Sequence, residues 1–312
     1  MKHSKFIISL DFELKWGIFD VLGADYDENL LGARKAIPKI LDVFEKNNIK
    51  ATWAIVGLLF ASTKADYKKF KPLLTPSYVK LNLDPYKQMI GESEESDKFY
   101  YAASLVELID NSKNQEIASH TYCHYYCKEI GQTKLEFEND VRSMALISSD
   151  KISKSIKSIV FPRNEVNMEY FDILIKNGFT HFRGNPENFF YSKGHRRFNI
   201  PIRALRLLDS YINITGNQVS IKETYNGLIN IVGNRILRPY SNKSILNLLM
   251  IRRIKNEMLY AAKNNKNYQI YWHPHNFGVN VNKNIENLSK VIDYYHVLNK
   301  KYGMISSNIS EI

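Results

Sequence analysis

Residues 116–124 read Glu116-Ile117-Ala118-Ser119-His120-Thr121-Tyr122-Cys123-His124, so a short strand-like run leads directly into two histidines four positions apart. The end of a strand is the usual place for an active site in an α/β barrel. If the second half of the stretch forms one helical turn, both imidazoles point the same way. Neutral imidazole is a favoured ligand of zinc and related metals. The stretch therefore predicts a metal site at a strand end, with two solvated surface histidines as the alternative.

An acidic pair follows an apolar run near the N-terminus. Lys5 to Leu10 is expected to form a buried first strand, and Asp11 and Glu13 come directly after it. Alternate residues of an extended segment point to the same side, so the two carboxylates share a face. Two like charges are costly in a core unless a metal or a cation balances them. One carboxylate can then bind a metal while the other serves as a base; the alternative is a solvated loop.

Three more candidates stand at the ends of predicted strands. Arg163 follows the run 156–161 in Phe161-Pro162-Arg163-Asn164, where an always-charged guanidinium could hold an acidic side chain ionised and oriented. Arg183 has a similar place, and an exposed surface position is the alternative for both arginines. His273 ends an apolar run, where a histidine can act as a general acid or base near neutral pH. Its alternative is a core histidine that caps the strand.

The two cysteines, Cys123 and Cys127, lie among the histidines and raise the alternative of a structural zinc site. Four ligands on one short helix cannot surround a tetrahedral ion, because closed zinc sites draw their ligands from two elements. We therefore interpret the cysteines as small packing residues. Their spacing also gives no disulfide framework, which agrees with a reducing compartment.

Predicted strands and helices alternate along the chain, which implies a mainly parallel sheet or barrel. Strands are expected at 5–10, 51–56, 116–119, 156–161, 179–182 and 268–272, and helices at 33–47, 99–111, 135–148, 168–176, 244–262 and 284–299. One domain over residues 1–312 accommodates them. The periodic pattern weakens at 62–98 and 186–267, and we expect insertions there.

Composition bounds the cellular context and the partners. The chain has 312 residues and a formal charge of +11, with much of the excess in the second half, including His195-Arg196-Arg197. Such a balance favours an anionic partner, with a solvated basic surface as the alternative. Neither a signal peptide nor a spanning helix is evident, which predicts a cytoplasmic protein. The basic helix at 244–262 could touch an acidic membrane surface, with a helix that packs on the barrel and has a basic outer face as the alternative. No motif supports nucleic-acid binding.

Taken together and in this order, the motifs resemble the polysaccharide deacetylase (NodB-homology) family of the carbohydrate esterase 4 group. They are Ser9-Leu10-Asp11-Phe12-Glu13, Ala51-Thr52-Trp53, Ser119-His120-Thr121-Tyr122-Cys123-His124, Phe161-Pro162-Arg163-Asn164 and Tyr271-Trp272-His273-Pro274-His275. The resemblance implies a distorted (β/α)7 barrel with insertions. The chain departs from the family pattern where Phe12 separates the two acids and where proline precedes Arg163.

The resemblance also implies site roles. Glu13, His120 and His124 would bind a divalent metal, zinc first, with cobalt, nickel or manganese as alternatives. Asp11 would be the base, although the roles of Asp11 and Glu13 could be exchanged. Arg163 would orient the base, and His273 would be the acid.

The implied activity is removal of an N-acyl group, acetyl first, from an amino sugar. The missing signal peptide and the positive charge add the expectation of a phosphate-bearing substrate, nucleotide- or lipid-linked, on a path to surface polysaccharide. The alternative is a non-catalytic carbohydrate-binding protein that keeps the barrel. The oligomeric state is left open.

Overall fold

The sheet of this protein is built around its first strand. The structure, a computed structural model, describes residues 3–188 and 200–312. β1 (Lys5–Phe12) pairs in parallel with β2 (Ala51–Ile55) on one side and with β9 (Tyr268–Trp272) on the other. A parallel strand covered on both faces needs a continuous apolar run, which the sequence Phe6-Ile7-Ile8 supplies.

Beyond β2 the sheet continues in parallel through three short strands. They are β3 (Gln115–Ser119), β4 (Ser158–Val160) and β5 (His181–Gly184). Two edge strands complete the sheet: β6 (Glu223–Tyr225) runs antiparallel to β7, and β10 (Ile305–Ser307) pairs with the start of β1.

One continuous segment joins the two ends of the sheet. β7 (Leu228–Val232) pairs with β5, and β8 (Arg235–Ile236) pairs with β9. Gly233 and Asn234 separate the two strands, and the amide of Gly233 donates to Gly184 while that of Asn234 donates to Gln269. The sheet therefore curls into a distorted barrel in which the described residues give seven parallel positions, with β7 and β8 counted as one and with β10, also parallel, lying off this path. This confirms the predicted α/β barrel.

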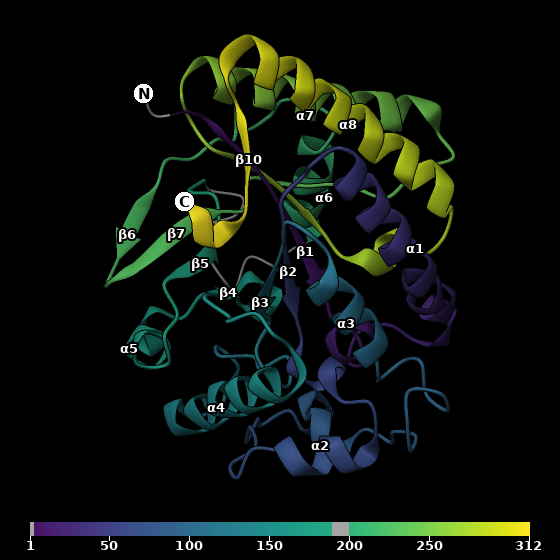
Figure 1. Ribbon diagram of the computed structural model, residues 1–312, viewed down its shortest axis with the longest axis vertical. Helices are drawn as coiled ribbons and strands as arrows, with labels where there is room; N and C mark the ends of the chain where they lie inside the picture. Colours follow the sequence, from purple (N-terminus) through teal and green to yellow (C-terminus); the bar gives the residue numbers. More distant parts are fainter. Residues whose placement is uncertain (1–2, 189–199) are drawn as a thin grey trace.

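Helices cover the outside of the curled sheet (Figure 1). They are α1 (Asp27–Lys46), α2 (Lys64–Phe70), α3 (Ala103–Asn111), α4 (Lys134–Lys151), α5 (Phe171–Lys176), α6 (Ile200–Asp209), α7 (Ser244–Lys263) and α8 (Val281–Tyr302). Among the described helices, none combines the length and apolar character that crossing a bilayer requires.

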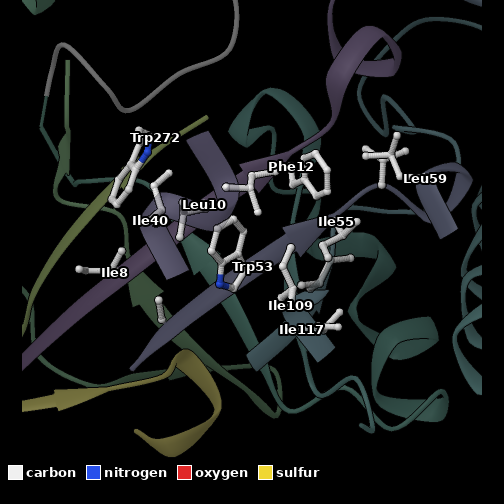
Figure 2. Close-up of a cluster of buried hydrophobic side chains, with 14 of the residues drawn as sticks. Ile8, Leu10, Phe12, Ile40, Trp53, Ile55, Leu59, Ile109, Ile117 and Trp272 are labelled. Carbon is white, nitrogen blue, oxygen red and sulfur yellow. The ribbon is translucent and has the colours of Figure 1, made fainter. Parts of the chain in front are cut away.

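The two faces of β1 bury different chemistry. Its outward residues Ile8 and Leu10 belong to the main apolar cluster, together with Trp53 and Trp272 from the neighbouring strands (Figure 2). Its inward residues are Ile7, Ser9 and Asp11, because side chains alternate along a strand. The inner face is thus apolar at its start and polar where the strand ends, so the site can form only at the carboxyl edge.

Ile309 closes the opposite, amino-terminal end of the barrel. Its side chain is fully buried against Ile7 and Ile231, and its amide donates to Thr52 Oγ1 at 2.9 Å. The next amide, that of Ser310, donates to Glu116. The three buried isoleucines, Ile7, Ile231 and Ile309, separate the polar interior of the barrel from solvent at this end.

The region expected as an insertion at 186–267 contributes directly to the sheet. It supplies β7 and β8, which close the barrel, and α7, which packs against α8. These strands were missed because one has five residues and the other two, with a glycine between them. The region at 62–98 contains α2 and two short 3-10 turns. Residues 189–199, including the basic His195-Arg196-Arg197, lie outside the described residues.

We expect Ile309→Ala to lower the free energy of unfolding by about 3 kcal/mol, because truncating a buried isoleucine loses apolar burial and leaves a cavity. Denaturation in urea measures this loss. Ile305→Ala is the matched control: its side chain is 38% exposed on β10, and a surface change typically costs about 0.5 kcal/mol or less. Equal losses in the two variants would contradict the role of Ile309.

Candidate metal centre

Polar side chains from several strand ends meet at the carboxyl edge of the barrel. Asp11 lies in β1 and Glu13 just beyond it, His120 follows β3, and His273 follows β9. His273 Nε2 lies 3.5 Å from Glu13 Oε1 and 3.8 Å from Asp11 Oδ2. Parallel strands bring their carboxyl ends to one edge, which is why residues so far apart in sequence converge here.

The Glu13 carboxylate lies between two imidazoles. Its Oε2 is 3.3 Å from His120 Nε2 and 3.0 Å from His124 Nε2. All three residues are buried, and one ligand atom from each lies within 4.8 Å of the others. In a tetrahedral site with metal–ligand bonds of about 2.0–2.1 Å, neighbouring ligand atoms are ~3.3 Å apart. The spacing therefore fits one metal ion held by three protein ligands, which leaves a coordination position open.

The surroundings of the two imidazoles also fit a metal. His120 Nδ1 lies 2.8 Å from the carbonyl oxygen of Val160, so a proton on Nδ1 leaves the Nε2 lone pair directed at the centre. His124 is buried, and neither of its ring nitrogens has a hydrogen-bond partner among the described residues; its 3.0 Å approach to Glu13 lacks hydrogen-bond geometry. Burial lowers the pKa of His124, which favours the neutral form that binds metals.

Gly17 makes room for the Glu13 side chain. The chain turns back after β1 through a 3-10 turn, Leu14–Gly17, and a Cβ placed on Gly17 would lie 2.0 Å from Glu13 Cδ. Burial raises the pKa of Glu13, but His273, His120 and His124 outweigh it and hold the pKa well below the usual value. The carboxylate is therefore confined in position and kept ionised.

The two histidines do not share the helical turn that their spacing suggested. Residues 120–124 form a loop in which Thr121 has φ 62° and His124 has φ 59°. This left-handed conformation is uncommon for residues other than glycine, and most of all for a β-branched one. Asp140 of α4 accepts hydrogen bonds from the loop amides of Tyr122 and Cys123. Asp140 was not among the residues predicted from the sequence, because it stands in an ordinary helical pattern whose buried face also contains Glu136 and Ser143.

Arg183, rather than Arg163, holds Asp11. The Arg183 guanidinium donates to both carboxylate oxygens of Asp11 at 2.6 Å, and to Ser9 Oγ at 2.9 Å. Asn164 Oδ1 accepts from its Nη2 at 2.8 Å. Both members of the ion pair are buried. Burial raises the pKa of Asp11, but the Arg183 charge outweighs it and lowers the pKa below the usual value.

Arg163, which the resemblance assigned to orienting the base, pairs elsewhere. Its guanidinium donates to Asp20 and lies over the Tyr126 ring at 3.7 Å. The cause is local backbone: β4 ends at Val160, and Arg163 follows Pro162 with φ 56°. Arg163 therefore lies past the strand end, whereas Arg183 sits within β5 and points into the barrel.

Two histidines after β9 differ in their environment. His275 is fully buried, and burial lowers its pKa to about 3, so it is uncharged at neutral pH and cannot donate a proton as an imidazolium. The His273 side chain is 27% exposed and faces both acids. Of the two, His273 has the position for a proton donor to a group that enters the site from solvent.

Part of the positive charge in the second half is buried in ion pairs. Arg235 donates to Asp209 at 2.8 Å and to Glu257 at 2.7 Å, and Arg253 lies 3.1 Å from Glu257. These two arginines therefore link α6, β8 and α7. Their charges are already paired within the protein, so they do not attract an anionic partner. Helix α7, expected at 244–262 with membrane contact and packing on the barrel as alternatives, packs against α8 and the sheet.

The chain is similar to proteins of known family and fold. A family model described as polysaccharide deacetylase matches residues 22–182, just over half of the chain and including His120 and His124. A solved structure from Mycobacterium smegmatis, described as a polysaccharide deacetylase, superposes with a TM-score of 0.61 at 11% identity, covering 99% of this chain and 88% of the other.

Two further structures share the fold. One from Pseudomonas aeruginosa PAO1, described as a polysaccharide deacetylase, has a TM-score of 0.58 at 8% identity and covers 98% of this chain and 88% of the other. The allantoinase PuuE has a TM-score of 0.57 at 9% identity and covers 99% and 89%. At these identities the likeness is in fold alone. No curated protein matches the sequence significantly.

We expect Gly17→Ala to lower the affinity for Zn²⁺ by about tenfold or more, because the new Cβ displaces the Glu13 carboxylate; small changes around metal ligands have effects of this size. Competition with a chromophoric chelator measures the affinity. Gly23→Ala is the control, since a Cβ there meets no atom within 4 Å. Unchanged affinity in Gly17→Ala would show that Glu13 is not a ligand.

Proposed function

Because the chain belongs to the polysaccharide deacetylase family, we propose that it is a metal-dependent hydrolase that removes an N-acyl group, acetyl first, from an amino sugar. The observation that carries the proposal is the convergence of three buried ligand atoms, from Glu13, His120 and His124. His273 lies between this cluster and Asp11, near both Glu13 and Asp11. Two imidazoles and one carboxylate form a ligand set of catalytic zinc sites. Zinc is therefore the metal that we propose first.

The residues around the centre supply what amide hydrolysis needs. An amide carbonyl is a poor electrophile and water is a poor nucleophile. A divalent metal at this site would polarise the carbonyl and lower the pKa of the water. Asp11 accepts the proton of the attacking water, since Arg183 holds its carboxylate ionised and oriented. His273 gives a proton to the departing nitrogen, without which the amine leaves badly.

The substrate that we propose is an N-acylated amino sugar that carries a phosphate, as a nucleotide- or lipid-linked sugar does. A net charge of +11 supports it, because a positive protein attracts anionic ligands.

Deacetylation of an N-acetylated amino sugar should fall to background when the protein is treated with a chelator, and should return when Zn²⁺ or Co²⁺ is added. Full turnover by metal-free protein would contradict the proposed chemistry.

Asp11→Asn should lower kcat by about 10²–10⁴-fold, the usual contribution of general acid–base catalysis. A carbohydrate-binding protein without turnover would show no such activity in the wild type and would bind the sugar equally well in both forms.

Arg183→Gln should move the acid limb of the kcat/KM profile to higher pH. The wild-type Asp11 has a lowered pKa, so activity that needs its carboxylate persists at neutral pH and is lost only as the pH falls through that low value. Without the guanidinium, burial dominates and raises the pKa of Asp11.

Arg163→Gln is the matched comparison for this profile, because it removes the cation that pairs with Asp20 and leaves the Asp11 pair intact. The acid limb should stay in place in that variant. An equal displacement in both variants would argue against Arg183 as the group that sets the ionisation of Asp11.

A further inference from the structure

The backbone between the two ligand histidines is anchored from outside the barrel. The Asp140 carboxylate accepts a hydrogen bond from Tyr122 N at 2.7 Å and another from Cys123 N at 3.0 Å. Tyr122 and Cys123 are two of the three residues between His120 and His124. Asp140 belongs to α4, is 1% exposed, and uses both carboxylate oxygens for these contacts. Among the described residues, Asp140 therefore joins an outer helix to the loop of residues 120–124, which we call the metal loop.

The carbonyls of the same loop are held from the other side. Gly57 N donates to the Thr121 carbonyl and Leu58 N to the Tyr122 carbonyl, both at 2.9 Å. These donors open the 3-10 turn Gly57–Phe60 that follows β2. The peptide groups that join Thr121 to Tyr122 and Tyr122 to Cys123 are thus hydrogen-bonded on both sides. Their carbonyls accept from the turn after β2, and their amides donate to Asp140.

The conformation held in this way is not one that the chain adopts readily. Thr121 and His124 both have left-handed φ values, and such residues persist only where their surroundings determine them. Tyr125 N donates to Thr121 Oγ1 at 2.6 Å, a contact within the loop. A carboxylate that accepts two N–H groups makes charge-assisted bonds, about twice as strong as neutral ones. Burial raises the pKa of Asp140 to about 6, so at neutral pH Asp140 is the charged partner that opposes relaxation of the loop.

We propose that Asp140 is a positioning residue for the metal centre: by fixing the two peptide groups between the histidines, it sets the separation and aim of His120 and His124. The inference rests on the metal site of the proposed function and deepens it. Asp140 touches neither ligand side chain, and its effect reaches the metal only through the backbone. A residue with this role governs how tightly the site binds a metal, apart from how stable the barrel is.

The test compares the Zn²⁺ affinity of purified wild type and Asp140→Asn by competition with a chromophoric chelator. The amide keeps one acceptor oxygen and turns an NH2 group against the other backbone N–H. The affinity should fall about 10–100-fold, the usual cost of disturbing the outer shell of a metal site. In the metal-free protein, the amide proton resonances of Tyr122 and Cys123 should move upfield as the charge-assisted bonds are lost. Unchanged affinity would overturn the inference.

Asp110→Asn is the matched control for general destabilisation. The Asp110 side chain is 8% exposed, and it accepts from Ser153 N at 2.9 Å and from Ser153 Oγ at 3.0 Å. Asp110 lies in α3, before the start of β3, whereas the metal loop of His120 and His124 follows the end of that strand. Its Zn²⁺ affinity should equal that of the wild type. A loss as large as that of Asp140→Asn would overturn the inference.

Two further results keep the outcome clear. If Asp140→Asn does not fold, Asp140→Glu decides: the charge and both acceptors remain but lie one methylene further out, so the affinity should again fall, and an unchanged value would overturn the inference. If the wild type itself binds no Zn²⁺, the proposed metal chemistry fails. If the wild type binds and Asp140→Asn binds equally well, only the role of Asp140 fails.

Discussion

Two carboxylates buried at the end of one strand impose the main constraint on this protein. Asp11 and Glu13 are each less than 5% exposed, and an isolated pair of buried negative charges would instead take up protons. Each acid is compensated differently. Asp11 receives a permanent cation from the protein, Arg183, whereas Glu13 faces two imidazoles, which carry no permanent charge. The second charge therefore has no fixed protein cation, and the metal ion proposed for this site would complete the balance.

This division explains why the barrel must be curled as it is. Arg183 reaches Asp11 only because β5 lies across the interior from β1, and it is itself fixed by Ser9 and Asn164. The ligand histidines come from the loop after β3, whose backbone is bonded to α4 and to the turn after β2. The charged centre thus depends on contacts between elements that are distant in the chain, with the apolar layer outside β1 holding them in register.

The sequence predicted those features that depend on local pattern. Apolar runs located six of the strands, and the acids and histidines at their ends identified Glu13, His120, His124 and Asp11 as neighbours. What it could not predict depends on backbone geometry and long-range contact. Arg163 and Arg183 both come at the end of strand-like runs in the sequence. The left-handed backbone at Arg163 turns its side chain away from the barrel interior, whereas Arg183 points into it. Asp140 sits in an ordinary helical pattern, and β7 and β8 are too short for their periodicity to stand out.

The place of β1 between β2 and β9 has a consequence for biosynthesis. One flanking strand follows within fifty residues, but the other begins at Tyr268, and at ~5–20 residues per second a ribosome takes on the order of ten seconds or more to reach it. During that interval one edge of the central strand has no partner, and His273 has not been made. Until then the sheet is open at this edge while the chain already carries both acids and the histidine pair. The last side chain of the candidate site, His273, arrives together with the strand that pairs with this edge.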